Sequence, residues 1–173
     1  MKNILIFVTA VPAFLLSAST SLAQSKPRLE GVWKITEVMV TYSNTVGKDS
    51  TITVNNPQPG LTIFTKGYYS VMAVRGSQPR AAVDPPKDPN NLTDAEKIAR
   101  FTQWRTLTAN SGTYEIKGST ILRHPIVAKN VDVMTQETAT IYEFKLEGDN
   151  TLWLSAPRST TEPGLKAKWT RVE

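Results

Sequence analysis

The stretch LTIFTKGYYSVMAV, from Leu61 to Val74, has two β-branched and aromatic runs on either side of Lys66 and Gly67. A two-residue loop that contains glycine, placed between two such runs, predicts a β-hairpin. The same alternation of short runs and turns continues along the chain in both directions. It predicts eight or nine strands, over residues 29–42, 51–54, 61–65, 68–74, 113–116, 120–127, 138–146, 151–155 and 165–172.

Strands that follow one another through hairpins form an antiparallel sheet in which sequence neighbours lie side by side. Closing such a sheet on itself removes its two exposed edges. We therefore predict an all-β fold, an antiparallel up-and-down β-barrel of about eight strands. The longest predicted strand, Leu29 to Tyr42, carries bulky residues on both faces. Because a slip of one residue exchanges the two faces, the pattern leaves open which side chains point inward.

One helix is predicted among the strands, at residues 93–107. Thr93 and Glu96 have the spacing of a capping box, and an apolar stripe follows them. An amphipathic helix among strands is expected to lie against the outside or the mouth of the sheet, with Trp104 as its anchor or as a cover. The preceding segment, Arg75 to Asn91, contains four prolines and is predicted to be a loop. Loops of this length are often functional.

The N-terminus has the pattern of a bacterial secretory signal peptide. Lys2 precedes an apolar run from Ile4 to Leu16, and Ser21-Leu22-Ala23 resembles a cleavage site. The apolar run is too short for a membrane span, which needs roughly 20 residues. We expect a signal peptide over residues 1–23, cleavage after Ala23, and a single mature domain, 24–173, without a transmembrane segment. The expected location is the periplasm or the extracellular medium.

The composition excludes several classes of site. The chain has no cysteine and one histidine, which rules out disulfides, thiolate metal sites and multi-histidine metal centres. No nucleotide-binding or hydrolase motif is present, and we expect neither a cofactor nor a metal. The net charge is +5 at pH 7, but no run of lysine and arginine exists, so nucleic acid is not an expected partner.

Several short motifs follow one another in a characteristic order. These are Gly31-Val32-Trp33, then GLTIFTKGYYS from residue 60, SGTYEI from 111, LEGD from 146, and Trp169-x-Arg171. Together they resemble the bacterial lipocalin-like domain family of small secreted barrels. The resemblance implies an eight-stranded barrel with an interior for side chains or one small ligand. It also implies structural roles for Gly31, Trp33, Trp169 and Arg171, with the Arg171 guanidinium across the Trp33 ring.

Five residues are candidates for ligand contact. His124, the only imidazole, is either a base or hydrogen-bond donor inside the barrel or a satisfied rim residue. Arg75 is either an anion clamp at the barrel mouth or an ion-pair partner of an acidic residue such as Glu115. The tyrosines offer an apolar face with one hydroxyl, which suits a cavity lining as well as an ordinary strand. They are Tyr69, Tyr114 and Tyr142.

The favoured function is a barrel that binds a small hydrophobic or amphipathic molecule in its interior. No residue is assigned a catalytic role. One alternative is a cyclase, isomerase or hydrolase in the same barrel, which requires His124, Arg75 or a tyrosine around one point. The other is a non-catalytic envelope interaction module, which requires a packed interior and an exposed apolar patch.

Overall fold

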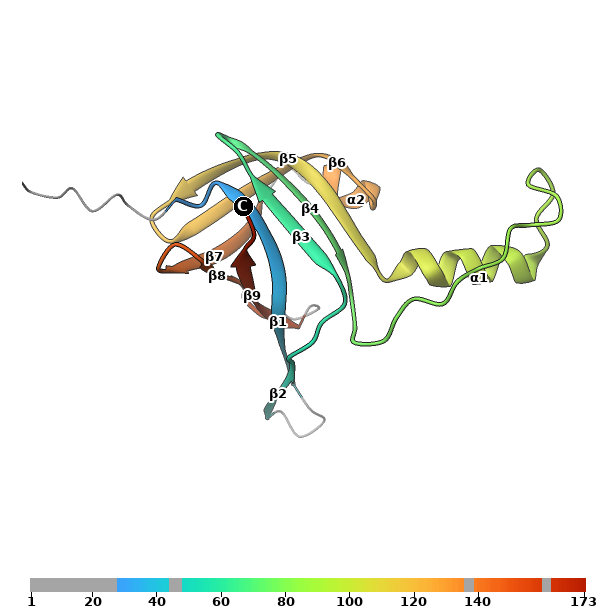
Figure 1. Ribbon diagram of the computed structural model, residues 1–173, viewed down its shortest axis with the longest axis horizontal. Coiled ribbons are helices and arrows are strands. Elements are labelled where there is room, and N and C mark those ends of the chain that lie inside the picture. Colours follow the sequence, from blue (N-terminus) through green and yellow to red (C-terminus); the bar gives the residue numbers. More distant parts are fainter. Residues whose placement is uncertain (1–27, 44–47, 136–138, 160–162) are drawn as a thin grey trace, which may run out of the picture.

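The computed structural model describes residues 28–43, 48–135, 139–159 and 163–173, and the predicted signal peptide, 1–23, lies outside them. The described chain folds mainly into strands, with two helices (Figure 1). The elements are β1 (Gly31–Ser43), β2 (Asp49–Val54), β3 (Gly60–Phe64), β4 (Tyr68–Val74), α1 (Asp94–Arg105), β5 (Leu107–Lys117), β6 (Thr120–Ala128), α2 (Val131–Thr135), β7 (Thr140–Glu147), β8 (Thr151–Ala156) and β9 (Gly164–Arg171).

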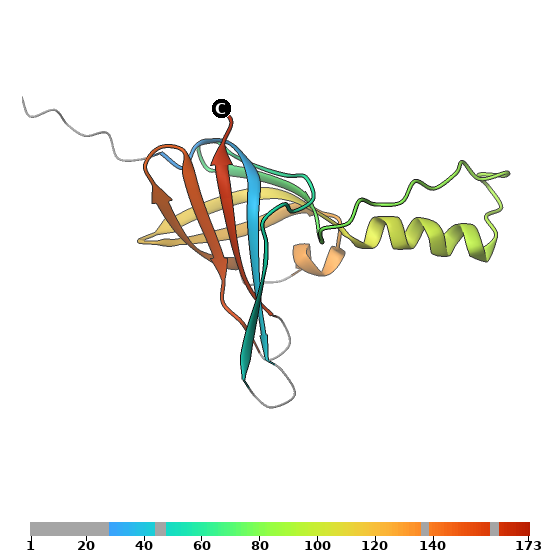
Figure 2. The same ribbon diagram turned by 60° about the horizontal axis from the view of Figure 1, so that its bottom comes forward.

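The strands form one antiparallel sheet that closes on itself. Its order is β2-β1-β3-β4-β5-β6-β7-β8-β9, and β9 pairs back onto β1. β1 is 13 residues long, so one of its edges pairs with β3 over residues 31–34 and with β2 over residues 38–43. Eight strands therefore close the barrel, and the β1–β2 hairpin extends beyond it (Figures 1 and 2). The predicted up-and-down barrel of about eight strands is confirmed.

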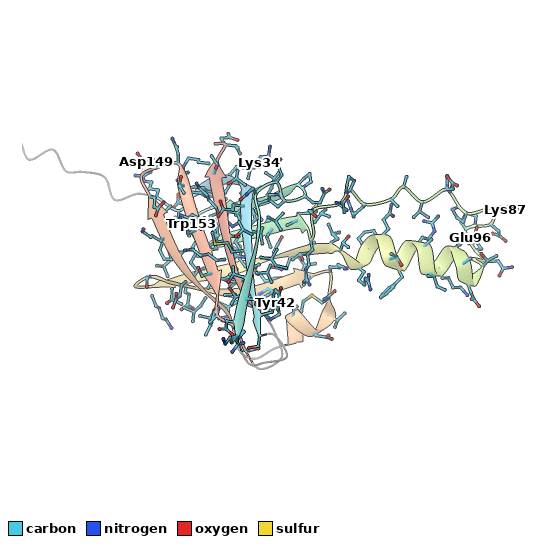
Figure 3. The ribbon with its side chains drawn as sticks, turned by 90° about the horizontal axis from the view of Figure 1, so that it is seen from below. Lys34, Tyr42, Lys87, Glu96, Asp149 and Trp153 are labelled. Carbon is cyan, nitrogen blue, oxygen red and sulfur yellow. The ribbon has the colours of Figure 1, made fainter. Side chains whose placement is uncertain are left out.

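The core is concentrated at the end of the barrel where β1 begins and β9 ends. Trp33, Phe64, Ile121 and Leu152 are fully buried there, each from a different strand. We call this the capped end; Lys34 and Asp149 lie at it, and Tyr42 lies toward the opposite end (Figure 3). Four large apolar side chains from four strands explain why strands far apart in sequence are held together at this end.

Helix α1 begins where the sequence predicts but does not lie against the barrel. Thr93 forms the expected capping box, because its side chain accepts from the Glu96 amide and Glu96 accepts from the Thr93 amide. No residue of α1 is buried, and the helix points away from the barrel (Figures 1 and 2). The expectation that it packs against the sheet is wrong, and Trp104 is 55% exposed.

Helix α1 contacts the proline-rich loop that precedes it instead of the barrel. Gln103 donates to the Ala81 carbonyl oxygen at 3.1 Å, and Arg100 donates to the Asp84 carbonyl oxygen at 3.4 Å. At the far tip the Lys87 amide donates to Glu96 at 3.3 Å (Figure 3). Loop and helix thus form one projecting arm, which we define as residues 75–106.

β5 and α2 differ from the sequence-based expectation. β5 begins at Leu107 rather than near Thr113, and its first half pairs with β4 along residues 107–113. A bulge at Ser111 and Gly112 interrupts its pairing with β6. The short helix α2 was not predicted. In the described part of the chain, no helix is long and apolar enough to cross a membrane.

Candidate functional site

A buried cation lies on the inner face of the barrel. In β6, Ile121 and Arg123 are buried, whereas His124 is exposed. Since side chains alternate across a strand, Ile121 and Arg123 both point into the barrel. Arg123 is only 5% exposed. Arg123 was not predicted as an inward residue, because arginine is almost never fully buried without a partner.

Three aromatic rings surround the Arg123 guanidinium. Its central carbon lies 4.6 Å from the centre of the Tyr142 ring, 4.8 Å from that of Tyr69 and 5.3 Å from that of Phe64. The rings belong to β7, β4 and β3, so the sheet must curve from β3 to β7 before they meet. Ring faces attract a cation, and this attraction offsets part of the cost of removing the charge from water. We call these four residues the Arg123 box.

The box and its surroundings hold hydrogen-bond donors without acceptors. Among the described residues, buried atoms without a hydrogen-bond partner include Nε and Nη2 of Arg123, the Tyr69 hydroxyl and Nε1 of Trp169. Every one of these groups can donate, and the arginine and tryptophan nitrogens cannot accept. A buried polar group left unpaired costs about 1–3 kcal/mol. The inner face therefore has unused donor capacity around a positive charge.

Burial determines the protonation of the box. Loss of water lowers the pKa of the Arg123 guanidinium, and the phenols of Tyr142 and Tyr69 act in the opposite direction. The guanidinium stays charged near neutral pH, because arginine does not lose its proton in proteins. Burial also raises the pKa of Tyr69 to about 12, although the charge of Arg123 opposes the shift. Tyr69 therefore remains a neutral hydroxyl that can donate.

No carboxylate of the described residues forms an ion pair with Arg123. The ion pairs found among the described residues do not include Arg123; examples are Arg158 with Asp49 and Lys145 with Glu147. The buried polar side chains there are Thr62 and Arg123, so the guanidinium is the buried charge of the barrel. A protein normally pairs such a charge.

The three candidate tyrosines lie near one another, and two of them belong to the box. Tyr69 and Tyr142 supply two of its rings. The Tyr114 ring contacts Phe64 edge-on, with centroids 5.2 Å apart, and its hydroxyl donates to the Thr65 carbonyl oxygen at 2.9 Å. Tyr114 thus lies opposite Arg123 on the same face of the sheet and packs against the box through Phe64, while its own hydroxyl is occupied.

His124 lies outside the barrel. It follows Arg123 directly and points to the opposite face, where its side chain is exposed. Its Nε2 is 3.8 Å from a Glu115 carboxylate oxygen on the outer surface. The expectation of a base or donor inside the barrel is therefore not met, because the strand register turns the imidazole to solvent.

Arg75 also lies away from the box. It is exposed at the base of the arm, where its Nε donates to the Thr108 hydroxyl at 3.0 Å and its amide donates to the Thr106 carbonyl oxygen. Glu115, which was considered as its partner, pairs with Lys117 and His124 instead. Arg75 joins the arm to β5 through these two hydrogen bonds.

The capped end is closed as the resemblance implies. The Arg171 guanidinium carbon lies 4.1 Å from the centre of the Trp33 ring. Arg171 also donates to the carbonyl oxygens of Arg28, Glu30 and Asp149. Gly31 has a positive φ of 138°, and any side chain there would overlap the Arg171 guanidinium. Trp169 is buried in the core next to this cap.

The inner face changes character toward the opposite end. The inward rows of β4, β5 and β8 continue there with small side chains that are half-buried rather than buried, and in β6 the bulge brings Ala128, opposite Asn110, onto the same face. These residues are Ala73, Asn110, Ala128 and Ala156. The interior is thus apolar and sealed at one end and carries one cation at the box. Beyond the box it has small residues on β4, β5, β6 and β8, and the larger Val40 and Leu165 on β1 and β9.

Two hollows lie elsewhere on the molecule. One hollow, of about 660 Å³, lies within the arm. It is lined by the loop residues 75–83 and by Ala99, Thr102 and Gln103 of α1. The other, of about 260 Å³, lies on the outer face of β7, β8 and β9 beside Trp153. Both are outside the barrel wall, because they are lined by arm residues or by outward positions such as Glu143 and Lys145.

Comparison with known proteins adds no assignment, because no protein-family model and no curated protein matches this chain.

Proposed function

We propose that this protein is an exported, lipocalin-like barrel that binds a small, mostly apolar molecule in its interior. The observation that carries the proposal is the contrast along the inner face. Fully buried Trp33, Phe64 and Leu152 seal the capped end, whereas small, half-buried residues such as Ala128 and Ala156 line the opposite end. An eight-stranded barrel is just wide enough to hold either side chains or one small ligand.

The enzymatic alternative is less well supported. The chain has one histidine, and its side chain is on the outer surface. The box offers a permanently charged guanidinium and a phenol whose pKa is raised to about 12, and neither group is a base near neutral pH. Binding therefore suits the inner face better than proton transfer does.

An interaction module is the second candidate function, and the arm favours it. Ile98, Phe101 and Trp104 follow one another at three-residue spacing along α1 and are 65%, 67% and 55% exposed. Side chains at this spacing lie on one face of a helix. Exposed apolar stripes of this kind mark contact surfaces. This function would use the outside of the molecule and is compatible with a ligand inside it.

The proposal is tested with a neutral apolar fluorophore, N-phenyl-1-naphthylamine, titrated into the purified mature protein. We expect saturable binding with one site per barrel. Ala156→Trp, on the inward row of β8, should abolish the binding by filling the interior. The matched control is Ser155→Trp on the outward row of the same strand, which should leave it intact.

Circular dichroism and the urea midpoint establish that both variants are folded. Absence of saturable binding in the unmodified protein contradicts the proposal, and so does equal binding by the two tryptophan variants. Binding that is lost only in Ser155→Trp assigns the probe to the outer hollow, which this residue lines.

A further inference from the structure

Two buried donors of the Arg123 side chain lie without a partner on one edge of its guanidinium. The unpartnered atoms are Nε and Nη2, and these two nitrogens lie on the same side of the planar guanidinium. Their two N–H bonds run roughly parallel, at a spacing that matches the two oxygens of a carboxylate. The aromatic rings of the box attract the charge but accept neither hydrogen bond in the way an oxygen does.

The Tyr69 hydroxyl adds a third donor to the same neighbourhood. Its ring centre is 4.8 Å from the guanidinium carbon, and its oxygen is buried without a partner in the described structure. Among the described residues, these three donors have no acceptor beside them except the Tyr69 oxygen itself, so the site is complementary to an anion. A buried cation without a counterion is otherwise an unfavourable arrangement.

The surroundings restrict the anion to a singly charged, planar group on an apolar body. Arg123 is the buried charged side chain of the described chain, and no lysine accompanies it inside. One guanidinium balances one negative charge, whereas a phosphate dianion needs more. The side chains buried around the interior are apolar and include Phe64, Val71 and Ile121. They favour a ligand whose charged group is attached to a hydrocarbon body.

We propose that Arg123, assisted by Tyr69, binds the carboxylate of the ligand, so that the ligand class is a small hydrophobic carboxylic acid. This inference rests on the proposed function, because it assigns the charged end of the molecule held in the barrel. The carboxylate lies along the Nε–Nη2 edge and accepts the Tyr69 O–H on one of its oxygens. Because these three atoms are closed to solvent in this structure, binding must displace neighbouring side chains.

The test compares decanoic acid with decan-1-ol, which has the same chain length but no charge. Each competes with N-phenyl-1-naphthylamine for the mature protein at pH 7.5. Charge-assisted hydrogen bonds predict that decanoate binds about tenfold to a hundredfold more tightly than decanol. Arg123→Met should remove this preference and leave decanol binding unchanged or stronger. Tyr69→Phe should reduce it by a smaller factor.

Arg75→Met is the matched control, because it removes an exposed arginine outside the barrel and should change neither affinity. Arg123→Met is expected to fold, since replacing an unpaired buried charge by an apolar side chain of similar length is often neutral or stabilising. If it does not fold, Tyr69→Phe and the acid-to-alcohol ratio of the unmodified protein still decide the question.

The outcomes separate the two proposals. Equal affinity for acid and alcohol overturns the carboxylate assignment and leaves the apolar interior site intact; this is the result if a buried water satisfies Arg123. A preference for the acid that persists in Arg123→Met also overturns the assignment, because the carboxylate then binds elsewhere. Binding of neither compound overturns both proposals.

Discussion

The guanidinium of Arg171 covers the ring of Trp33, with its central carbon 4.1 Å from the ring centre, and joins the last strand of the barrel to the first. The same guanidinium donates to the carbonyl oxygens of Arg28, Glu30 and Asp149. One side chain thus closes the sheet, fixes the segment before β1 and holds the turn between β7 and β8. The capped end depends on this arrangement.

Arg171→Lys should destabilise the protein nearly as much as Arg171→Ala, by about 2–4 kcal/mol, because an ammonium neither stacks as a plane nor reaches three carbonyls. Urea unfolding followed by tryptophan fluorescence measures the change. Lys34→Ala, an exposed position on β1, is the control and should change the free energy of unfolding by less than about 0.5 kcal/mol. Unchanged stability in Arg171→Lys would show that charge alone closes the cap.

Gly112→Ala should weaken the pairing of β5 with β6. A methyl group there would lie 2.8 Å from Cα of Pro125 and even closer to the His124 carbonyl oxygen, both of which are backbone atoms. We expect a loss of about 1–3 kcal/mol. Gly164→Ala is the comparison, because its nearest contacts are at 3.4 Å, an ordinary packing distance. Equal urea midpoints for the two variants would contradict the close approach at the bulge.

Stability should fall at high pH because of Tyr69. Its folded-state pKa is about 12, above its usual value of 10, so the folded state holds the phenol proton more tightly. The contribution is fully present below pH 10 and is lost as the pH rises from 10 to 12, by about 2 kcal/mol. Urea unfolding at pH 9 and pH 11.5 measures the loss. It should be smaller in Tyr69→Phe, and an identical loss in both proteins would place the responsible group elsewhere.

Thr93→Ala should loosen α1 without loosening the barrel. Loss of the cap costs the helix about 1 kcal/mol. Since no residue of α1 is buried, amide exchange in residues 94–105 should accelerate while the urea midpoint of the barrel stays unchanged. Thr102→Ala, in the middle of the helix, serves as the control. A lower barrel midpoint in Thr93→Ala would mean that the arm packs on the barrel in solution.

The local features of this protein were predictable from its sequence. The hairpin of β3 and β4 follows from Lys66 and Gly67 between two β-branched runs, and the start of α1 follows from the Thr93–Glu96 capping box. Turn chemistry and capping act over a few residues, so a short stretch of chain contains all the atoms involved. The all-β class and the number of strands follow from repeating such signals.

The site was only half predictable. Tyr69 and Tyr142 were candidates because strand tyrosines suit an interior. Arg123 was not predicted, whereas its neighbour His124 was a candidate, either inside the barrel or as a rim residue. The segment Leu122-Arg123-His124 has no clear alternation of apolar and polar residues. Which of two adjacent side chains enters the barrel depends on the register of β6 against β5 and β7.

The sequence by itself determined where strands, turns and the helix cap form, because those choices rest on neighbouring residues. Only the tertiary structure decided which face of each strand is inside, that the arm projects instead of covering the sheet, and that three rings from three strands enclose one guanidinium. Those outcomes require strands distant in sequence to pair and the barrel to close. Their energies come from burial and contacts that do not exist in any one segment.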